Sequence, residues 1–307
     1  MKCALRAISI AMFMLLSANI FACLNLYVIN EKGKESVYDD YPPYRVDMSP
    51  KNDLQSLKLH ERWIREAEGE DDQYKTISNY AVYLIKLGHN KEALEILKKL
   101  ARKHTKEYAL LANLATAYEL NGYPDSALKY MKQSLKIYPG SHWDSEWFHV
   151  RFLEATLQHR DKKTAIDDLN ILKIDTAVSD KTVFGVTHQL HERIPLTSAP
   201  NAMLSKALEE CGDYFRKQVS IDWSAKLYAK AIGFSTNEKA TTRLWQKIES
   251  VRAKVVELNK KNSKAASRDQ VRRQLLAANW RSYLQKDIDR WKAHKAHYEE
   301  KLQIMKL

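Results

Sequence analysis

The sequence predicts an all-α fold, a helical solenoid followed by a long C-terminal helical hairpin. The main observation is an internal repeat in residues 74–141. A shift of 34 residues places seven residues on identical ones, and the apolar positions between them also coincide. Each copy has the pattern of two amphipathic helices with a Gly at the turn, and this period indicates stacked helix pairs. The 307 residues include only eight Gly and seven Pro, which favours long helices with short connections.

The start of the chain has the parts of a secretory leader. Lys2 and Arg6 provide positive charge, and residues 7–21 form an apolar run without a charged residue. This run is shorter than the roughly 20 residues that a membrane-spanning helix needs. We therefore predict a signal peptide over residues 1–22.

The leader ends with Ile20, Phe21, Ala22 and Cys23, a sequence that resembles the lipobox of bacterial lipoproteins. The resemblance implies cleavage after Ala22 and attachment of acyl chains to Cys23. It also implies an exported protein, anchored as a lipoprotein to a membrane of the cell envelope and expected on the periplasmic face. Two acyl chains anchor a protein stably, whereas one is marginal. Two alternatives stay open: ordinary secretion with an unmodified Cys23, and an uncleaved membrane anchor.

The segment after Cys23 is expected to link the membrane to the folded body. Residues 23–48 are predicted to form an extended tether, because Pro42 and Pro43 disfavour a helix. In the alternative interpretation, residues 24–29 form a short strand or pack on the first helix. A helix that covers the apolar end of the solenoid is then predicted within residues 49–73.

The two clear copies span residues 74–107 and 108–141. Both carry large apolar residues at four positions and small residues where the two helices cross. In the first copy these are Ile77, Tyr80, Leu84, Leu97, Ala81 and Ala93, and in the second Leu111, Leu114, Tyr118, Met131, Ala115, Ala127 and Ser134. Helices approach closely only where both carry small side chains. The pattern resembles the tetratricopeptide repeat (TPR). The resemblance implies a right-handed stack of antiparallel helix pairs that binds proteins or peptides, with a repeat region over residues 74–238.

Two less regular copies complete this region. A degenerate third copy spans residues 142–200, and its second helix is expected at residues 164–174. Another helix is expected at residues 183–193, where Pro195 would stop it. A fourth copy spans residues 205–238.

Residues 239–307 are predicted to form a basic helical hairpin or coiled coil. From residue 238 onward the chain has 18 Lys and Arg against 8 Asp and Glu, so this part supplies +10 of the net charge of +12. Acidic residues are interleaved with the basic ones, which favours a solvated face. Contact with an anionic membrane surface or an acidic protein is the alternative. A nucleic-acid partner is not expected for an exported chain.

The sequence offers no recognisable catalytic, cofactor-binding or metal-binding motif. His188 and His191 lie three residues apart but have no third ligand at a suitable spacing. A Gly-rich phosphate loop and a GxSxG nucleophile turn are absent from the sequence. Cys211 would be left without a disulfide partner after removal of the leader and acylation of Cys23. We predict that the protein is not an enzyme and needs no cofactor or metal.

The TPR resemblance also predicts a partner groove. The first-helix positions that line the concave groove in that family include Asn79, Asn113, Trp143 and Trp147 here. We predict that Trp143 and Trp147, one turn apart on one helix, anchor a peptide, because Trp is enriched at binding hot spots. Asn79 and Asn113 would hydrogen bond to the peptide backbone. In the alternative interpretation, a later helix folds over the two Trp residues and buries them.

These observations together predict a non-enzymatic scaffold of the bacterial cell envelope that binds a protein or peptide partner. The alternative is an envelope enzyme, or an enzyme subunit, that acts on a cell-wall or glycan substrate through scattered residues.

Overall fold

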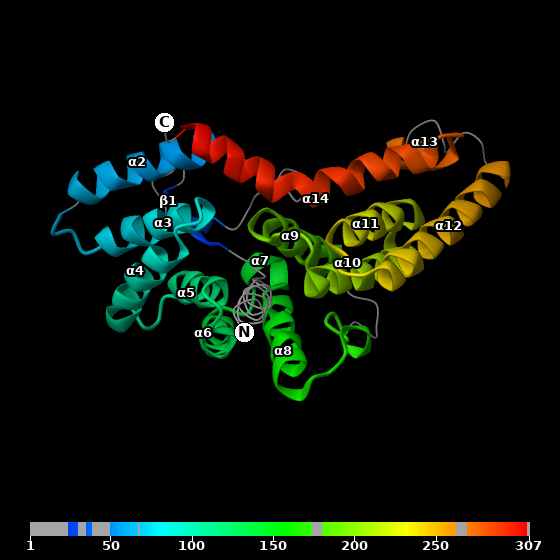
Figure 1. Ribbon diagram of the computed structural model, residues 1–307. Coiled ribbons are helices and arrows are strands. Elements are labelled where there is room, and N and C mark those ends of the chain that lie inside the picture. The colour runs from blue at the N-terminus through cyan, green and yellow to red at the C-terminus, as the bar shows by residue number, and fades with distance from the viewer. Residues whose placement is uncertain are drawn as a thin grey trace, which may run out of the picture.

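The computed structural model describes residues 24–29, 35–38, 50–66, 68–173, 180–261 and 269–305. It confirms the predicted fold class, since helices stack in consecutive pairs and a long helical hairpin follows them (Figure 1). The predicted leader and Cys23 lie outside the described residues.

The two clear repeats form the first part of the stack. Their helices are α3 (Gln73–Lys86), α4 (Asn90–Lys103), α5 (Tyr108–Leu120) and α6 (Pro124–Ile137), each packed against the next. Gly88 and Gly122 stand at the turns within the pairs with φ of +84° and +80°. This conformation favours Gly at a helix C-terminus, so the chain reverses within three residues in both pairs.

Small residues stand where the paired helices cross. Ala81 and Ala93 in the first pair, and Ala115 and Ala127 in the second, are completely buried. The helices can therefore approach closely, while larger residues such as Leu97 fill the space on either side.

The third copy departs from the repeat. Its first helix is broken into α7 (Ser141–Asp144) and α8 (Trp147–Lys162). The prediction of a second helix at residues 164–174 is wrong, since the described residues 163–173 contain only the 3₁₀ helix η1 (Ile166–Asp168).

A side chain from the next repeat explains this difference. Leu169 and Leu172 are buried as the helical spacing predicts. The backbone N–H groups of Ile171 and Leu172, however, donate to Oε2 of Glu210 at 2.8 Å. The segment can therefore reach the core without forming a helix.

Helix α9 (Asp180–Leu196) extends beyond the predicted residues 183–193. Pro195 lies inside its last turn, so the expectation that Pro195 would stop the helix is wrong. α9 packs against α7 and also contacts α14 (Trp280–Met305).

The fourth copy consists of α10 (Ala202–Tyr214) and α11 (Ile221–Phe234), joined by the π-helical turn η2 (Phe215–Val219). Gly212 allows the two helices to pack tightly. A Cβ atom on Gly212 would lie 2.5 Å from the ring of Tyr228.

The hairpin begins with α12 (Glu238–Lys261), which packs on α11, and continues through α13 (Gln270–Leu276) into α14. α14 then runs back along the stack to α2 (Pro50–Glu66), the helix that packs on α3 (Figure 1). The hydroxyl of Tyr298 in α14 lies 3.0 Å from both Oδ2 of Asp53 and the carbonyl oxygen of Lys86. The C-terminal helix thus joins the end of the stack to its beginning.

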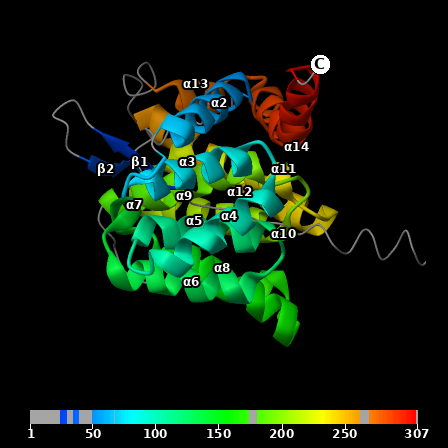
Figure 2. The same ribbon diagram turned by 90° about the vertical axis from the view of Figure 1, so that its left-hand side faces the viewer.

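Of the predicted tether over residues 23–48, the structure describes residues 24–29 and 35–38, and it favours the alternative interpretation of a short strand within residues 24–29. Residues Leu26–Ile29 form strand β1, which pairs in an antiparallel hairpin with β2 (Glu35–Tyr38). β1 also packs against α3, and Figure 2 shows both strands beside this helix. The chain is therefore held on the solenoid from Leu24 to Ile29. In the described part of the chain, no helix has the length and apolar character to cross a membrane.

Candidate functional site: a strand held by two asparagines

Two repeat asparagines bind the backbone of the N-terminal segment. The backbone N–H of Asn25 donates to Oδ1 of Asn113 at 2.7 Å, and Nδ2 of Asn113 donates to the carbonyl oxygen of Asn25 at 2.9 Å. In the same way, the N–H of Tyr27 donates to Oδ1 of Asn79 at 2.8 Å, and Nδ2 of Asn79 donates to the Tyr27 carbonyl at 2.7 Å. Each asparagine therefore binds both polar backbone groups of one residue.

The register of these bonds follows from strand and repeat geometry. In an extended chain, residues i and i+2 present their backbone groups to the same side. Asn79 and Asn113 are 34 residues apart, at the same position of two consecutive repeats. Each of the two repeats therefore binds one residue of the strand, and the two bound residues are two positions apart. We call the part of α3 and α5 that carries Asn79 and Asn113 the strand-binding surface.

A neighbouring side chain helps to orient one of the two amides. Nδ2 of Asn113 also lies 3.3 Å from Oγ of Ser78, which is completely buried on α3. Asn113 itself is completely buried, and Asn79 is only 7% exposed. Both amides are thus fixed inside the protein, where hydrogen bonds are shielded from water.

The side chains of the strand are buried as well. Asn25 is 0% exposed, Leu26 9% and Tyr27 8%. The ring of Tyr27 packs edge-on against Tyr74, with ring centroids 6.1 Å apart, and Tyr74 stacks on His104. Leu24 packs against the apolar core of the first repeats. The strand is therefore held by apolar contacts as well as by four hydrogen bonds.

The two predicted Trp residues do not extend this surface. The prediction that Trp143 and Trp147 share one helix is wrong, since Trp143 lies in α7 and Trp147 begins α8. Trp147 is half-buried and packs against the apolar core that contains Phe148 and Phe152. The rings of Trp147 and Phe148 pack edge-on, with their centroids 6.4 Å apart. The side chain of Trp143 lies outside the described residues. Because Trp147 stands where Asn79 and Asn113 stand in their repeats, the asparagine pattern ends after two copies.

A buried polar cluster occupies the space between the second and third copies. It consists of Glu119 of α5, His142 of α7, Glu146, His149 of α8 and Arg193 of α9, all at most 7% exposed. Nε2 of His149 lies 2.6 Å from Oε2 of Glu119, and Nδ1 of His142 lies 2.5 Å from Oε2 of Glu146. Nη1 of Arg193 donates to Oε1 of Glu119 at 3.2 Å.

The cluster joins three parts of the chain that are distant in sequence. Burial alone would raise the pKa of Glu146, but the charge of His142 and hydrogen bonds from His142 and His149 hold this pKa well below its usual range. The carboxylate is thus stabilised in its charged form. The sequence analysis did not predict this cluster; the signal that could have indicated it is His149, at the position where the two clear copies have Ala81 and Ala115.

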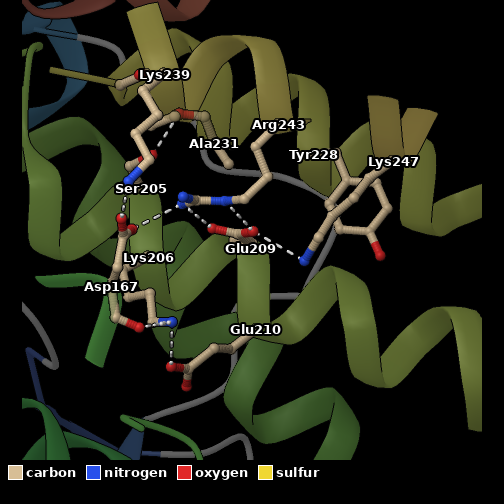
Figure 3. Close-up of polar contacts among 12 residues, drawn as sticks. Asp167, Ser205, Lys206, Glu209, Glu210, Tyr228, Ala231, Lys239, Arg243 and Lys247 are labelled. Atoms are coloured by element: carbon tan, nitrogen blue, oxygen red, sulfur yellow. Dashed lines mark hydrogen bonds and ion pairs between the residues drawn. The ribbon is translucent and has the colours of Figure 1, made fainter. Parts of the chain in front are cut away.

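The basic hairpin uses part of its charge for internal ion pairs. Figure 3 shows Arg243 and Lys247 of α12 directed toward Glu209 of α10. The closest N–O distances are 2.9 Å for Arg243 and 2.8 Å for Lys247. Burial alone would raise the pKa of Glu209, but hydrogen bonds from these two side chains hold it below its usual range. Asp167 adds a second carboxylate 3.0 Å from Arg243.

The remaining candidate groups that the structure describes are Cys211 and His188, and both are buried. Burial raises the pKa of the Cys211 thiol to about 12, so this cysteine is a poor nucleophile at neutral pH. Nε2 of His188 lies 3.4 Å from Oε1 of Glu192, and the side chain of His191 lies outside the described residues. Among the described residues, no group of three His, Cys, Asp or Glu is placed to hold a metal ion.

Comparison with known proteins adds one line of similarity. A protein of Synechococcus sp. (strain CC9311), the photosystem I assembly protein Ycf3, is 26% identical over 140 residues, which cover 40% of this chain and 79% of that protein. The protein of the same name from Prochlorococcus marinus (strain NATL1A) is 24% identical over 135 residues, 38% of this chain and 76% of its own length. No family model matches the chain, and no solved structure matches it. The similarity supports the TPR-type helical repeat at low identity over about two-fifths of the chain.

Proposed function

We propose that this protein is a non-enzymatic scaffold that holds an extended segment of a partner protein on its strand-binding surface. The observation that carries this proposal is the pair of asparagines, each of which binds the N–H and the C=O of one residue of an extended chain. Such contacts recognise backbone, so they suit a protein or peptide rather than a small molecule.

The similar proteins support this class of function. The Synechococcus and Prochlorococcus proteins are both described as assembly proteins, and assembly requires contact with other proteins. We extend to this chain only the capacity to bind proteins. The asparagines Asn79 and Asn113 carry the proposed contact, and Trp147, which packs against the core, has no part in it.

We further propose that the scaffold is exported and attached to a membrane of the cell envelope through acyl chains on Cys23. The support is the order of segments in residues 1–23: a positively charged start, an apolar run, and then Ala22 and Cys23. Intact-mass analysis of the mature protein should show loss of residues 1–22 and an added acyl mass. Cys23→Ser should move the protein to the soluble envelope fraction or block its processing. Wild-type protein that is soluble and unmodified would contradict the lipid anchor.

Partner capture with matched variants tests the scaffold function. Tagged full-length protein is used to capture partners from detergent-solubilised envelope, as wild type, as the double variant Asn79→Ala/Asn113→Ala, and as Gln133→Ala. Gln133 is an exposed amide on α6 and serves as the control. We expect a protein that wild type and Gln133→Ala retain and the double variant loses. Retention by all three, or turnover of a cell-wall or glycan substrate by the purified protein, would contradict the proposal.

A further inference from the structure

We propose that residues 24–29 are an intramolecular competitor of the partner, so that a partner segment binds the strand-binding surface only by displacing them. This inference rests on the function proposed above. It assigns to the N-terminal segment a regulatory role at the same site.

The resident strand already uses the contacts that a partner would need. Both hydrogen-bonding edges of Asn79 and Asn113 are taken by the backbone of Tyr27 and Asn25. None of these four bonds involves a side chain of the strand. A different extended segment could therefore form the same four bonds, but two segments cannot form them together.

The resident strand is not the best occupant of this surface. Asn25 is completely buried, and neither Nδ2 nor Oδ1 of its side chain has a hydrogen-bond partner among the described residues. A buried amide without partners is costly because it loses its hydrogen bonds to water. A segment with an apolar residue at this position would avoid the cost. The geometry thus points to an extended partner segment whose residue opposite Asn113 is apolar.

Covalent attachment compensates for this weaker fit. Because the strand belongs to the same chain, it competes at an effective concentration that is typically in the millimolar range for short linkers. Pairing of β1 with β2 also holds it in an extended form. A free segment must therefore bind considerably better than the resident strand before it can replace it.

Synthetic peptides test the competition on the full-length protein. One peptide has the sequence of residues 24–29, and the second carries Asn25→Leu in that sequence; both have two added C-terminal lysines for solubility. We expect the Asn25→Leu peptide to bind the wild-type protein at least about fivefold more tightly than the native sequence. Equal affinities of the two peptides would overturn the proposed role of the Asn25 side chain. No binding of either peptide at millimolar concentration would overturn the proposal that the strand-binding surface accepts another segment.

A second test uses a protein variant whose resident strand binds the surface more weakly. Tyr27→Pro removes the N–H that Asn79 accepts and lies outside every helix, so the solenoid should stay folded. We expect both peptides to bind this variant at least about tenfold more tightly than they bind wild type. Adding Asn113→Ala should reverse the gain. Equal affinity for wild type and Tyr27→Pro would show that the strand does not compete.

Displacement can also be followed without any substitution in the protein. With saturating Asn25→Leu peptide, the N–H groups of Asn25 and Tyr27 in the protein should exchange with solvent at least about tenfold faster. If the peptide binds without changing this exchange, it binds elsewhere and the competition is wrong. Failure of the proposed function looks different, since partner capture would then not depend on Asn79 and Asn113.

Discussion

Asn79 and Asn113 occupy the same position in consecutive repeats, and each binds one of two alternate residues of a single strand. The spacing of the helix pairs therefore matches the two-residue repeat of an extended chain. An Asn side chain can pair with a peptide group in this way because it offers one donor and one acceptor side by side, as a neighbouring strand would. A stack of helices thereby presents a substitute for a strand edge.

The helix crossings should not tolerate large residues. Ala93 and Ala127 are completely buried, and overpacking such a site typically costs about 1–3 kcal/mol. We expect Ala93→Trp and Ala127→Trp to lower the thermal midpoint clearly. Lys98→Trp, on a partly exposed side chain, should leave it nearly unchanged. Equal effects at the three positions would contradict the assignment of the small residues.

Gly185 should be required for the contact between α9 and α7. A Cβ atom there would lie 2.6 Å from the carbonyl oxygen of His142 and 2.5 Å from Oγ of Ser145. Gly185→Ala should therefore push the helices apart and destabilise the protein by about 2 kcal/mol in urea denaturation. Gly140→Ala is the matched control, because its nearest contact would be 3.2 Å from the side chain of Asp144. A smaller loss for Gly185→Ala than for Gly140→Ala would contradict this packing.

The buried polar cluster should make stability depend on pH in the acid range. In the folded protein the pKa of Glu146 is held below its usual value. In the unfolded chain the pKa of this carboxyl is about 4.3. The folded state therefore binds fewer protons at this site than the unfolded state. The stabilising contribution is complete above that pH and declines as the pH falls toward the folded pKa. Glu192, whose pKa is also lowered, adds to the same trend.

Glu146→Gln isolates this contribution. Removing one partner of a buried ion pair costs about 3–5 kcal/mol. We expect the difference in unfolding free energy between wild type and Glu146→Gln to be largest at pH 6–7 and to shrink between about pH 4.5 and pH 3.5. A difference that stays constant over this interval would show that folding does not lower the pKa of Glu146.

The C-terminal helix should be held partly by Tyr298. Its hydroxyl lies 3.0 Å from Asp53 and 3.0 Å from the carbonyl of Lys86, and a hydrogen bond to a charged group contributes about 1.5–3 kcal/mol. Tyr298→Phe should lower the unfolding free energy by about 1–2 kcal/mol. Tyr283→Phe, at an exposed position of the same helix, should have no measurable effect. Equal stability of the two variants would contradict a role for Tyr298 in joining α14 to α2.

Local patterns in the sequence were sufficient to predict the helix pairs. Small side chains are needed where the helices cross, at Ala81 and Ala115. Glycine is favoured at the turns with positive φ, at Gly88 and Gly122. Both requirements can be recognised from the sequence of one repeat copy. The same repeat placed Asn79 and Asn113 on one surface and suggested that they bind the backbone of a peptide. Whether they bind a partner stays a prediction.

Contacts between distant segments could not be predicted in this way. Residues 25 and 113 are separated by 88 positions, and no local pattern shows that the N-terminal segment returns to α5. Leu169 and Leu172 have helical spacing, yet the segment is not helical there, and Glu210 accepts hydrogen bonds from the backbone N–H groups of Ile171 and Leu172. The cluster around Glu146 likewise could not be predicted. Its side chains come from α5, α7, α8 and α9, and these helices pack together only because the first helix of the third copy is broken into α7 and α8.

Amide hydrogen exchange at Asn25 and Tyr27 tests most directly whether Asn79 and Asn113 hold the N-terminal strand. In the wild-type protein, we expect both N–H groups to exchange about 100-fold or more slowly than in an unfolded chain, which corresponds to a local opening free energy of about 2.7 kcal/mol or more. Asn113→Ala should remove this protection at Asn25, while Gln133→Ala should leave it intact. Exchange of Asn25 and Tyr27 in wild type at the rate of an unfolded chain, with the amides of α3 and α5 still protected, would contradict the binding of the strand.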